Sequence, residues 1–274
     1  MVRNLQFFKN NKAMTGIITL PLVPLRESNS ERSEMTSQLL FGELVEIIEE
    51  RESWFYVCNL ADNYTGWIDR KMIKKLDSPE LQLLQNSSSF RISVPVSVCK
   101  KTTSEATMFL PGGSILYGFA DNEPIIADEN YIVEKSDILI SKDISGDEII
   151  RLAFQYLNAP YLWGGKSVLG IDCSGLVQLV FSICGIQLLR DASQQVDDGE
   201  VIDFLSEVKA GDLAFFENAD GKIIHVGILV NSQQIIHASG CVKIDTIDSQ
   251  GIISCQTGEY SHKLRVIKRL ISGI

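Results

Sequence analysis

The first part of the chain contains short apolar segments that alternate between hydrophobic and polar positions. Residues 42–48 alternate over their first half, and residues 54–58 are aromatic and β-branched. Residues 63–68 turn through asparagine and glycine and then return to a strand pattern. So many short strands between residues 14 and 73 predict a small β-barrel.

A strand pattern returns between residues 90 and 140. It follows a polar stretch, residues 74–89, whose last part, residues 86–89, is typical of a linker. Residues 94–99 predict a strand, and a Pro-Gly-Gly turn at residues 111–113 leads into another apolar segment. This pattern predicts a second small barrel.

Helical spacing replaces the strand pattern from residue 145 onward. Ser145 and Glu148 have the spacing of a capping box. Apolar residues then follow at i, i+3, i+4 and i+7, namely Ile150, Ala153, Phe154 and Leu157. Pro160 should stop this helix, and a second apolar helix is predicted over residues 173–184.

Short apolar strands follow the two helices. They are predicted over residues 212–216, 224–230, 234–239 and 264–270. Helices followed by antiparallel strands indicate an α+β domain. The sequence therefore predicts three units: two small all-β barrels and one α+β domain, over residues 1–78, 79–143 and 144–274.

Composition narrows the function classes. The 274 residues are 45% hydrophobic and 22% charged, with a net charge of −10, which argues against binding to nucleic acid or to an anionic membrane. Residues 1–10 contain no apolar core of signal-peptide length. Six cysteines without a CxxC spacing disfavour a zinc scaffold and a disulfide framework, so a reducing, cytoplasmic location is expected.

Cys173 is the candidate nucleophile. It stands where the second helix should begin, after a glycine-rich stretch. Because a helix N-terminus stabilises negative charge, we expect this position to lower the pKa of the thiol. The other cysteines, Cys58, Cys99, Cys184, Cys241 and Cys255, are interpreted as structural.

Two of the three histidines lie in adjacent apolar strands. Each alone is more often a core residue than a catalyst. His225 and His237 share one face of the sheet only if the connection has an odd length. A three-residue loop at residues 231–233, with Val230 facing Gln234, meets that condition.

The motifs of the last unit together resemble the NlpC family of bacterial cell-wall cysteine peptidases. They are Tyr161-x-Trp163-Gly164-Gly165, Asp172-Cys173-Ser174-Gly175, Gly211-Asp212-Leu213, His225-Val226-Gly227-Ile228 and Ile236-His237-Ala238. The resemblance implies a papain-like fold in which Cys173 is the nucleophile, His225 the base and His237 the orienting group. It also implies that Tyr161 helps to bind the oxyanion. No metal or other cofactor is expected.

The resemblance also implies a substrate. The γ-D-glutamyl-L-diamino acid endopeptidase branch of the family joins N-terminal SH3-like barrels to the peptidase. It cleaves peptidoglycan stem peptides that have a free N-terminal L-alanine, as in cell-wall peptide recycling. Asp172 and Ser174 then contact the ammonium group, and Glu43 and Tyr64 close that end of the site. On their own, Glu43 would be interpreted as a solvated strand charge and Tyr64 as a turn aromatic.

A segment at residues 190–193 resembles the substrate-facing part of these enzymes. Asp191 is the binding candidate there. Many members have a serine directly after this aspartate, whereas this chain has Ala192. Arg190 and Asp191 could equally form a structural ion pair.

Several alternatives stay open at this point. The chain could be a peptidoglycan-binding module, an endopeptidase on intact cell wall, or an acyltransferase or amidase on the same scaffold. A zinc site built from Cys173, His225 and His237 lacks ligand spacing within the sequence. The expected partner is a murein peptide, L-Ala-γ-D-Glu-diamino acid. The diamino acid and the oligomeric state are not fixed by the sequence.

Overall fold

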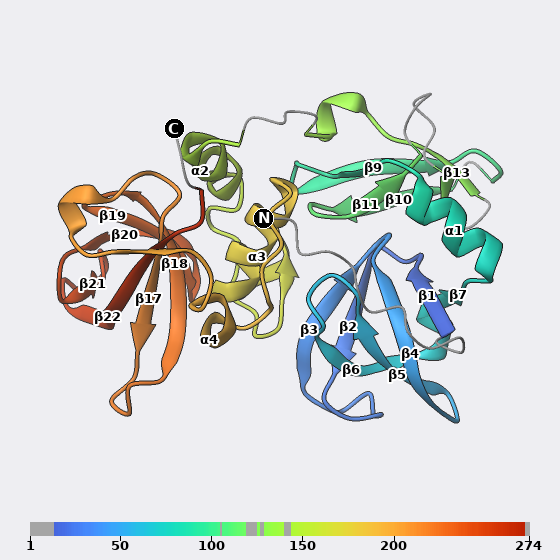
Figure 1. Ribbon diagram of the computed structural model, residues 1–274, viewed down its shortest axis with the longest axis horizontal. Helices are drawn as coiled ribbons and strands as arrows, with labels where there is room; N and C mark the ends of the chain where they lie inside the picture. Colours follow the sequence, from blue (N-terminus) through green and yellow to red (C-terminus); the bar gives the residue numbers. More distant parts are fainter. Residues whose placement is uncertain (1–13, 105, 119–124, 127–128, 140–143, 272–274) are drawn as a thin grey trace.

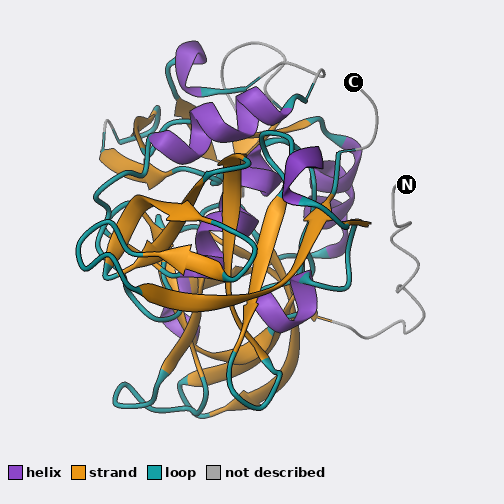
Figure 2. Cartoon of the chain, turned by 90° about the vertical axis from the view of Figure 1, so that its left-hand side faces the viewer, coloured by secondary structure: helices purple, strands orange, loops and turns teal. Residues whose placement is uncertain are grey.

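The computed structural model describes residues 14–104, 106–118, 125–126, 129–139 and 144–271. The expectation about residues 1–10 therefore lies outside the described residues. Among the described helices, none is long and apolar enough to cross a membrane. Figure 2 shows that strands dominate the chain.

A seven-stranded antiparallel sheet forms the first unit, in the order β3-β2-β6-β5-β4-β1-β7. The strands are β1 Met14–Ile18, β2 Leu22–Arg26, β3 Met35–Leu40, β4 Leu44–Arg51, β5 Trp54–Asn59, β6 Thr65–Asp69 and β7 Ile73–Lys75. Alternate residues along β2 and β5 are buried, and they pack around Val23, Leu25 and Phe55. The strand pattern read from the sequence is therefore present.

The polar stretch contains a helix that was not predicted, α1 Ser78–Asn86, and the predicted linker, residues 86–89, connects this helix to the next strand. Asp77 caps it by accepting from the Glu80 N–H, and the Glu80 carboxylate accepts from the Asp77 N–H. This capping box, with Pro79 in the first turn, starts a helix that needs little apolar surface. The sequence analysis missed this helix because it considered only the polarity of the stretch and not its capping residues.

The second unit is also built of short strands. They are β8 Ser89–Arg91, β9 Val96–Lys101, β10 Thr107–Pro111, β11 Ile115–Tyr117, β12 Ile125–Ile126 and β13 Glu129–Ile132. They form a four-stranded sheet, β10-β9-β13-β12, and the pair β11-β8. Its core is continuous with the first unit, because Phe41 packs edge-on against Tyr131 with ring centroids 5.3 Å apart.

The last unit packs helices against a second seven-stranded antiparallel sheet, in the order β16-β22-β17-β18-β19-β20-β21. Its elements are α2 Gly146–Phe154, β14 Lys166–Ser167, β15 Gly170–Ile171, α3 Cys173–Ile183, α4 Ala192–Gln195, β16 Glu200–Ile202, β17 Leu213–Glu217, β18 Ile223–Asn231, β19 Gln234–Ser239, β20 Cys241–Ile247, β21 Gly251–Ile253 and β22 Tyr260–Arg269. A further β21–β22 pairing closes the sheet on itself. Figure 1 shows α3 between this sheet and the N-terminal units.

Both predicted helices are present, with one difference in length. Ser145 caps α2 by accepting from the Glu148 N–H, but α2 ends at Phe154. Phe154 and Leu157 are exposed rather than part of the buried face. The α3 helix begins at Cys173, as expected, and Val226, Ile228 and Ile236 belong to the core that it packs into.

Polar contacts join the first unit to the last. The Glu43 carboxylate and the Lys166 ammonium form a buried ion pair at 3.3 Å. The Gln178 side-chain amide donates to Asp62 at 2.9 Å, and the Trp163 indole donates to Glu34 at 2.6 Å. The first unit is thus held against the loops that surround Cys173.

Candidate active site

Cys173 occupies the first turn of α3, and its side chain is buried. The Asp172 carboxylate caps the helix by accepting from the Gly175 N–H at 2.6 Å. The backbone N–H groups of Val226 and Ser174 point to the sulfur and favour its thiolate. The nucleophile is therefore held against strand β18, next to His225.

The pKa of Cys173 differs from the sequence expectation. Burial raises the pKa of this thiol to about 11, and the neighbouring Asp172 carboxylate adds to the rise. The two N–H groups and Arg190 oppose the shift without cancelling it. The prediction of a lowered pKa was wrong because desolvation outweighs the helix N-terminus.

A chain of hydrogen bonds runs from His225 to Asp245. His225 Nε2 lies 2.8 Å from His237 Nδ1, and His237 Nε2 lies 2.9 Å from Asp245 Oδ2. Burial opposes ionisation of Asp245, but hydrogen bonds from His237 and Cys255 hold the pKa of this carboxyl well below its usual value. An ionised Asp245 can only accept a hydrogen bond, so His237 Nε2 carries the proton and donates it. His237 Nδ1 is then unprotonated and acts as an acceptor.

This tautomer assignment fixes the role of His225. Its Nε2 must carry the proton shared with His237, so its Nδ1 has a free lone pair. Burial, followed by the neighbouring His262 and His237, lowers the pKa of His225 well below its ordinary value. A neutral His225, which precedes the Val226 N–H that contacts the sulfur, can accept the proton of the neutral Cys173 thiol.

The two histidines share a face for a reason different from the predicted one. The connection is a two-residue turn closed by the pair Asn231–Gln234, which alone would place them on opposite faces. A β-bulge between Leu229 and Asn231 inserts the extra residue. The same-face condition is met, whereas the predicted Val230–Gln234 pairing was wrong.

Gly227 lies between the two histidines on that face. A Cβ at this position would stand 2.9 Å from His237 Cβ and 2.7 Å from Ile235 Cδ1. These distances are shorter than ordinary carbon contacts. The glycine therefore leaves the space in which the His225 and His237 rings meet.

His262 is a site residue that the sequence analysis missed. Its ring stacks on His225, with centroids 4.1 Å apart and planes at 23°. Burial lowers the pKa of His262 to about 4, so this ring is neutral at neutral pH. Together with His225 and His237 it forms a group of side chains that could hold a metal ion.

Tyr161 lies near Cys173 and Asp172. Its backbone N–H donates to Gly240 at 2.9 Å, and it forms a β-bridge with Ile171. Burial, followed by the nearby Cys173 and Asp172, raises the pKa of the Tyr161 phenol to about 12. The phenol therefore keeps its proton and can donate it in a hydrogen bond to an oxyanion near Cys173.

Asp172 and Ser174 are held by Arg190. The Arg190 guanidinium binds both oxygens of Asp172, at 3.0 and 2.6 Å, and the Ser174 hydroxyl at 2.9 Å. Both partners of the ion pair are buried. The alternative of a structural ion pair between Arg190 and Asp191 was therefore wrong, because the guanidinium pairs with the Asp172 carboxylate that caps α3.

Asp191 and Tyr64 meet across the interface between the first and last units. The Tyr64 hydroxyl donates to Asp191 Oδ1 at 3.4 Å. Burial raises the pKa of Asp191, and burial together with Asp191 raises that of Tyr64 to about 12. Tyr64 is thus more than a turn aromatic, since it brings the first unit to the loop that carries Asp191.

Glu43 lies in the interface between the first and last units, and its contacts differ from those predicted. Its side chain is buried, so the alternative of a solvated strand charge was wrong. Its carboxylate accepts from the Leu40 N–H and pairs with Lys166. These contacts join the two units, and among the described contacts of Glu43 there is none to Cys173 or Asp172.

Both the first unit and the last unit match known protein families. Residues 158–260 match the NlpC/P60 family, and residues 25–73 match the bacterial dipeptidyl-peptidase SH3 domain. The chain carries an NlpC/P60 domain. An SH3-like unit precedes it, so the multidomain organisation of a cell-wall peptidase is present.

Similar proteins match most of the chain. A gamma-D-glutamyl-L-lysine dipeptidyl-peptidase of Bacillus subtilis (strain 168) is 28% identical over 258 residues, which are 86% of this chain and 81% of the relative. Dipeptidyl-peptidase 6 of Lysinibacillus sphaericus is 27% identical over 86% of this chain and 93% of its own length. An NlpC/P60 family protein from Bacillus cereus ATCC 10987 superposes with a TM-score of 0.81 at 18% identity, covering 93% of this chain and 99% of that one, which supports the fold alone.

The raised pKa of Cys173 predicts how the NlpC/P60 domain reacts with iodoacetamide. Below a pKa of about 11 the thiolate fraction grows with pH, so alkylation of Cys173 should accelerate about tenfold per pH unit between pH 7 and pH 10. Mass spectrometry of the Cys173 peptide measures the rate, with glutathione as the reference thiol. A rate that levels off near pH 7 would instead indicate a thiolate–imidazolium pair in the free enzyme.

Proposed function

We propose that the chain is a cysteine peptidase that hydrolyses the γ-D-glutamyl–diamino acid bond of peptidoglycan stem peptides with a free N-terminal L-alanine. The observation that carries the proposal is the position of Cys173. Its sulfur accepts from the backbone N–H of Val226, the residue after His225, and His225 begins the hydrogen-bond chain to Asp245. The first unit adds a polar wall, formed by Tyr64 and Asp191, to the same domain. The proposal is also supported by two relatives named as dipeptidyl-peptidases, each of which matches 86% of this chain.

The proposed reaction follows from the protonation states. His225 Nδ1 takes the proton of the Cys173 thiol as the sulfur attacks the γ-carbonyl carbon of D-glutamate. The Tyr161 hydroxyl and the Cys173 N–H stabilise the oxyanion that forms. His225 then gives the proton to the leaving amine of the diamino acid, and water, activated by the same histidine, releases the acyl group.

The polar wall supports recognition of an ammonium group. Asp172 already accepts from Arg190, Gly164 and Gly175, so we assign it the task of holding Ser174 and the start of α3. Asp191 and the Tyr64 hydroxyl have fewer partners and lie where the first unit meets the last. We therefore infer that Asp191 and Tyr64 provide the main acceptors for the L-alanyl ammonium.

Two finer points of architecture are part of the proposal. The short strands β8–β13, whose core is continuous with that of the first unit, support a second SH3-like barrel. A nucleophile-bearing helix packed on an antiparallel sheet that carries the histidine supports a papain-like layout. The domain limits 1–78, 79–143 and 144–274 and the cytoplasmic location remain predictions, the location to be tested by cell fractionation.

The free amine is the feature to test. We expect L-Ala-γ-D-Glu-L-Lys to be cleaved to L-Ala-γ-D-Glu, and the N-acetylated peptide to react roughly 10²-fold more slowly or worse, because buried acceptors lose their partner. Chromatography of the products measures both rates. In the Asp191→Asn and Tyr64→Phe variants, the ratio of the cleavage rate of the free peptide to that of the acetylated peptide should decrease, because cleavage of the free peptide becomes slower.

The alternatives give different results in the same assay. Equal rates on free and acetylated peptides, with release of fragments from purified cell wall, would favour an endopeptidase on intact wall. Binding to cell wall without turnover of either peptide would favour a binding module. Transfer of the dipeptide to an added amine in place of water would favour an acyltransferase.

A further inference from the structure

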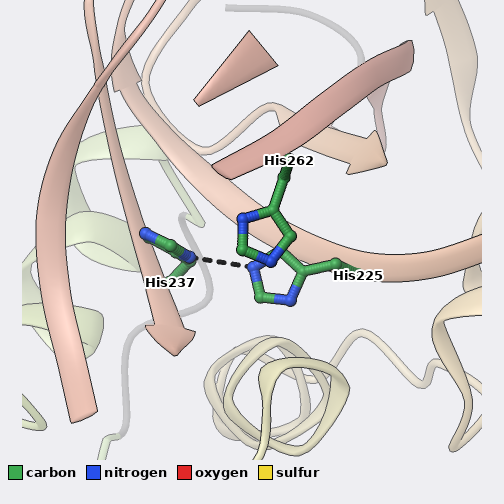
Figure 3. A group of neighbouring side chains, drawn as sticks. All are labelled: His225, His237 and His262. Carbon is green, nitrogen blue, oxygen red and sulfur yellow. Dashed lines mark hydrogen bonds between the residues drawn. The ribbon is translucent and has the colours of Figure 1, made fainter. Parts of the chain in front are cut away.

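All three histidines of the chain meet at one place. His225 comes from β18, His237 from β19 and His262 from β22, three strands of the same sheet. One ligand nitrogen from each lies within 4.8 Å of the others. Figure 3 shows the His237 ring directed toward the stacked rings of His225 and His262. The proposed reaction uses His225 and His237 but gives no task to His262.

The surroundings orient these nitrogens as they are oriented in metal sites. Asp245 accepts from His237 Nε2, which turns the Nδ1 lone pair of His237 toward the other two rings. A carboxylate behind a histidine is the usual outer partner of a metal-bound imidazole. His262 Nδ1 lies 2.9 Å from Ser261 Oγ, so its Nε2 is the nitrogen left for the cluster.

We propose that His225, His237 and His262 bind one divalent transition-metal ion of the Zn²⁺ class, and that this ion inhibits the peptidase. The binding site rests on the geometry of the three rings, whereas the inhibition rests on the proposed function. His262 is only partly buried, so an ion reaches the cluster from its side. His225 and His237 lie deeper and complete the ligand set.

The donor set selects the kind of ion. Three imidazoles with one open position suit Zn²⁺ and its neighbours Co²⁺ and Ni²⁺, whereas Mg²⁺ and Ca²⁺ prefer oxygen ligands. Nitrogens bound to one tetrahedral Zn²⁺ at 2.0–2.1 Å are about 3.3 Å apart. The present 2.8 Å contact between His225 and His237 therefore has to open slightly and lose its hydrogen bond. Catalysis and metal binding then exclude each other.

The inhibition follows from counting protons. In the catalytic arrangement the single proton of neutral His225 lies on Nε2, and Nδ1 is the base. A metal ion takes the Nε2 lone pair, so the proton moves through solvent to Nδ1 with no net release. Nδ1–H can no longer accept the proton of the Cys173 thiol. The bound ion thus blocks the base without touching the nucleophile.

The binding step is tested in the Cys173→Ala protein, which has no thiolate to act as a ligand. After treatment with EDTA, we expect calorimetry to show one Zn²⁺ bound per chain, with the same affinity as in the parent protein. The added change His262→Phe keeps a ring on His225 but removes a ligand, and should weaken binding by roughly 100-fold. His262→Gln serves as a second variant if the phenylalanine disturbs folding.

The inhibition step is scored as the ratio of peptidase rates without and with saturating Zn²⁺, so that changes in basal rate cancel. We expect a roughly 10²-fold loss in the parent, the contribution of a general base, and a much smaller loss in His262→Phe. Zn²⁺ binding that disappears in Cys173→Ala, or that survives unchanged in both His262 variants, would overturn the proposed site. A parent protein that never cleaves stem peptides refutes the proposed function instead, and leaves the calorimetric result to decide the metal site.

Discussion

Turnover of L-Ala-γ-D-Glu-L-Lys is expected to fall below detection in Cys173→Ala. Loss of a nucleophile from such a catalytic set lowers the rate by roughly 10⁶-fold, because the covalent route is lost altogether. Cys173 lies in the first turn of α3, and its helix is capped by Asp172 rather than by its own side chain. The variant should therefore keep its fold, which circular dichroism and the melting temperature check.

The matched control is Cys184→Ala. Cys184 is also a buried cysteine of α3, but it stands at the opposite end, in the C-cap position. It is distant from the hydrogen-bond chain of His225, so its loss should leave most of the activity. Product release that persists in Cys173→Ala, or that is lost equally in both variants, would mean that Cys173 is not the nucleophile.

The sequence predicted the parts of the site that depend on local pattern. The start of α3 at Cys173 follows from the helical spacing of apolar residues directly after a glycine-rich stretch. His225 and His237 stand out because they interrupt apolar strands that pair with each other. These features require only a few neighbouring residues, so a single chain is enough to find them.

Pairings between distant segments could not be predicted in the same way. Asp245 and His262 lie in β20 and β22, and only their register against β19 and β21 brings them to the site. The bulge in β18 also shifts the register of β18 against β19 by one residue. The partner of Arg190 likewise depends on which loop packs against α3. Local sequence patterns do not indicate which distant segments pair or pack together.

The same limit explains the pKa of Cys173. A helix N-terminus can be recognised in the sequence, and it does favour the thiolate through the Ser174 N–H. Burial by the surrounding segments cannot be recognised there, and it raises the pKa more strongly than the helix lowers it. The balance between the two became visible only with the tertiary structure.

Arg190→Met is expected to destabilise the protein by about 3–5 kcal/mol, the usual result of removing one partner from a buried ion pair. Arg190 is 1% exposed, and Asp172 would be left as an unpaired carboxylate in the same buried position. The guanidinium also donates to the Ser37 hydroxyl at 2.9 Å, so a contact with the first unit is lost as well. Urea denaturation measures the free energy of unfolding, and peptidase activity should fall with it.

Two comparisons show whether the loss of the ion pair causes the lower stability of Arg190→Met. Arg151→Met removes an exposed pair with Glu148 on α2 and should cost less than about 1 kcal/mol. Arg190→Lys keeps the charge but cannot bind both oxygens of Asp172, so its stability should lie between those of the parent and Arg190→Met. If Arg190→Met and Asp172→Asn add up without coupling in the double variant, the two side chains do not stabilise each other. If they couple, the ion pair at the start of α3 connects the stability of the fold to the placement of Cys173.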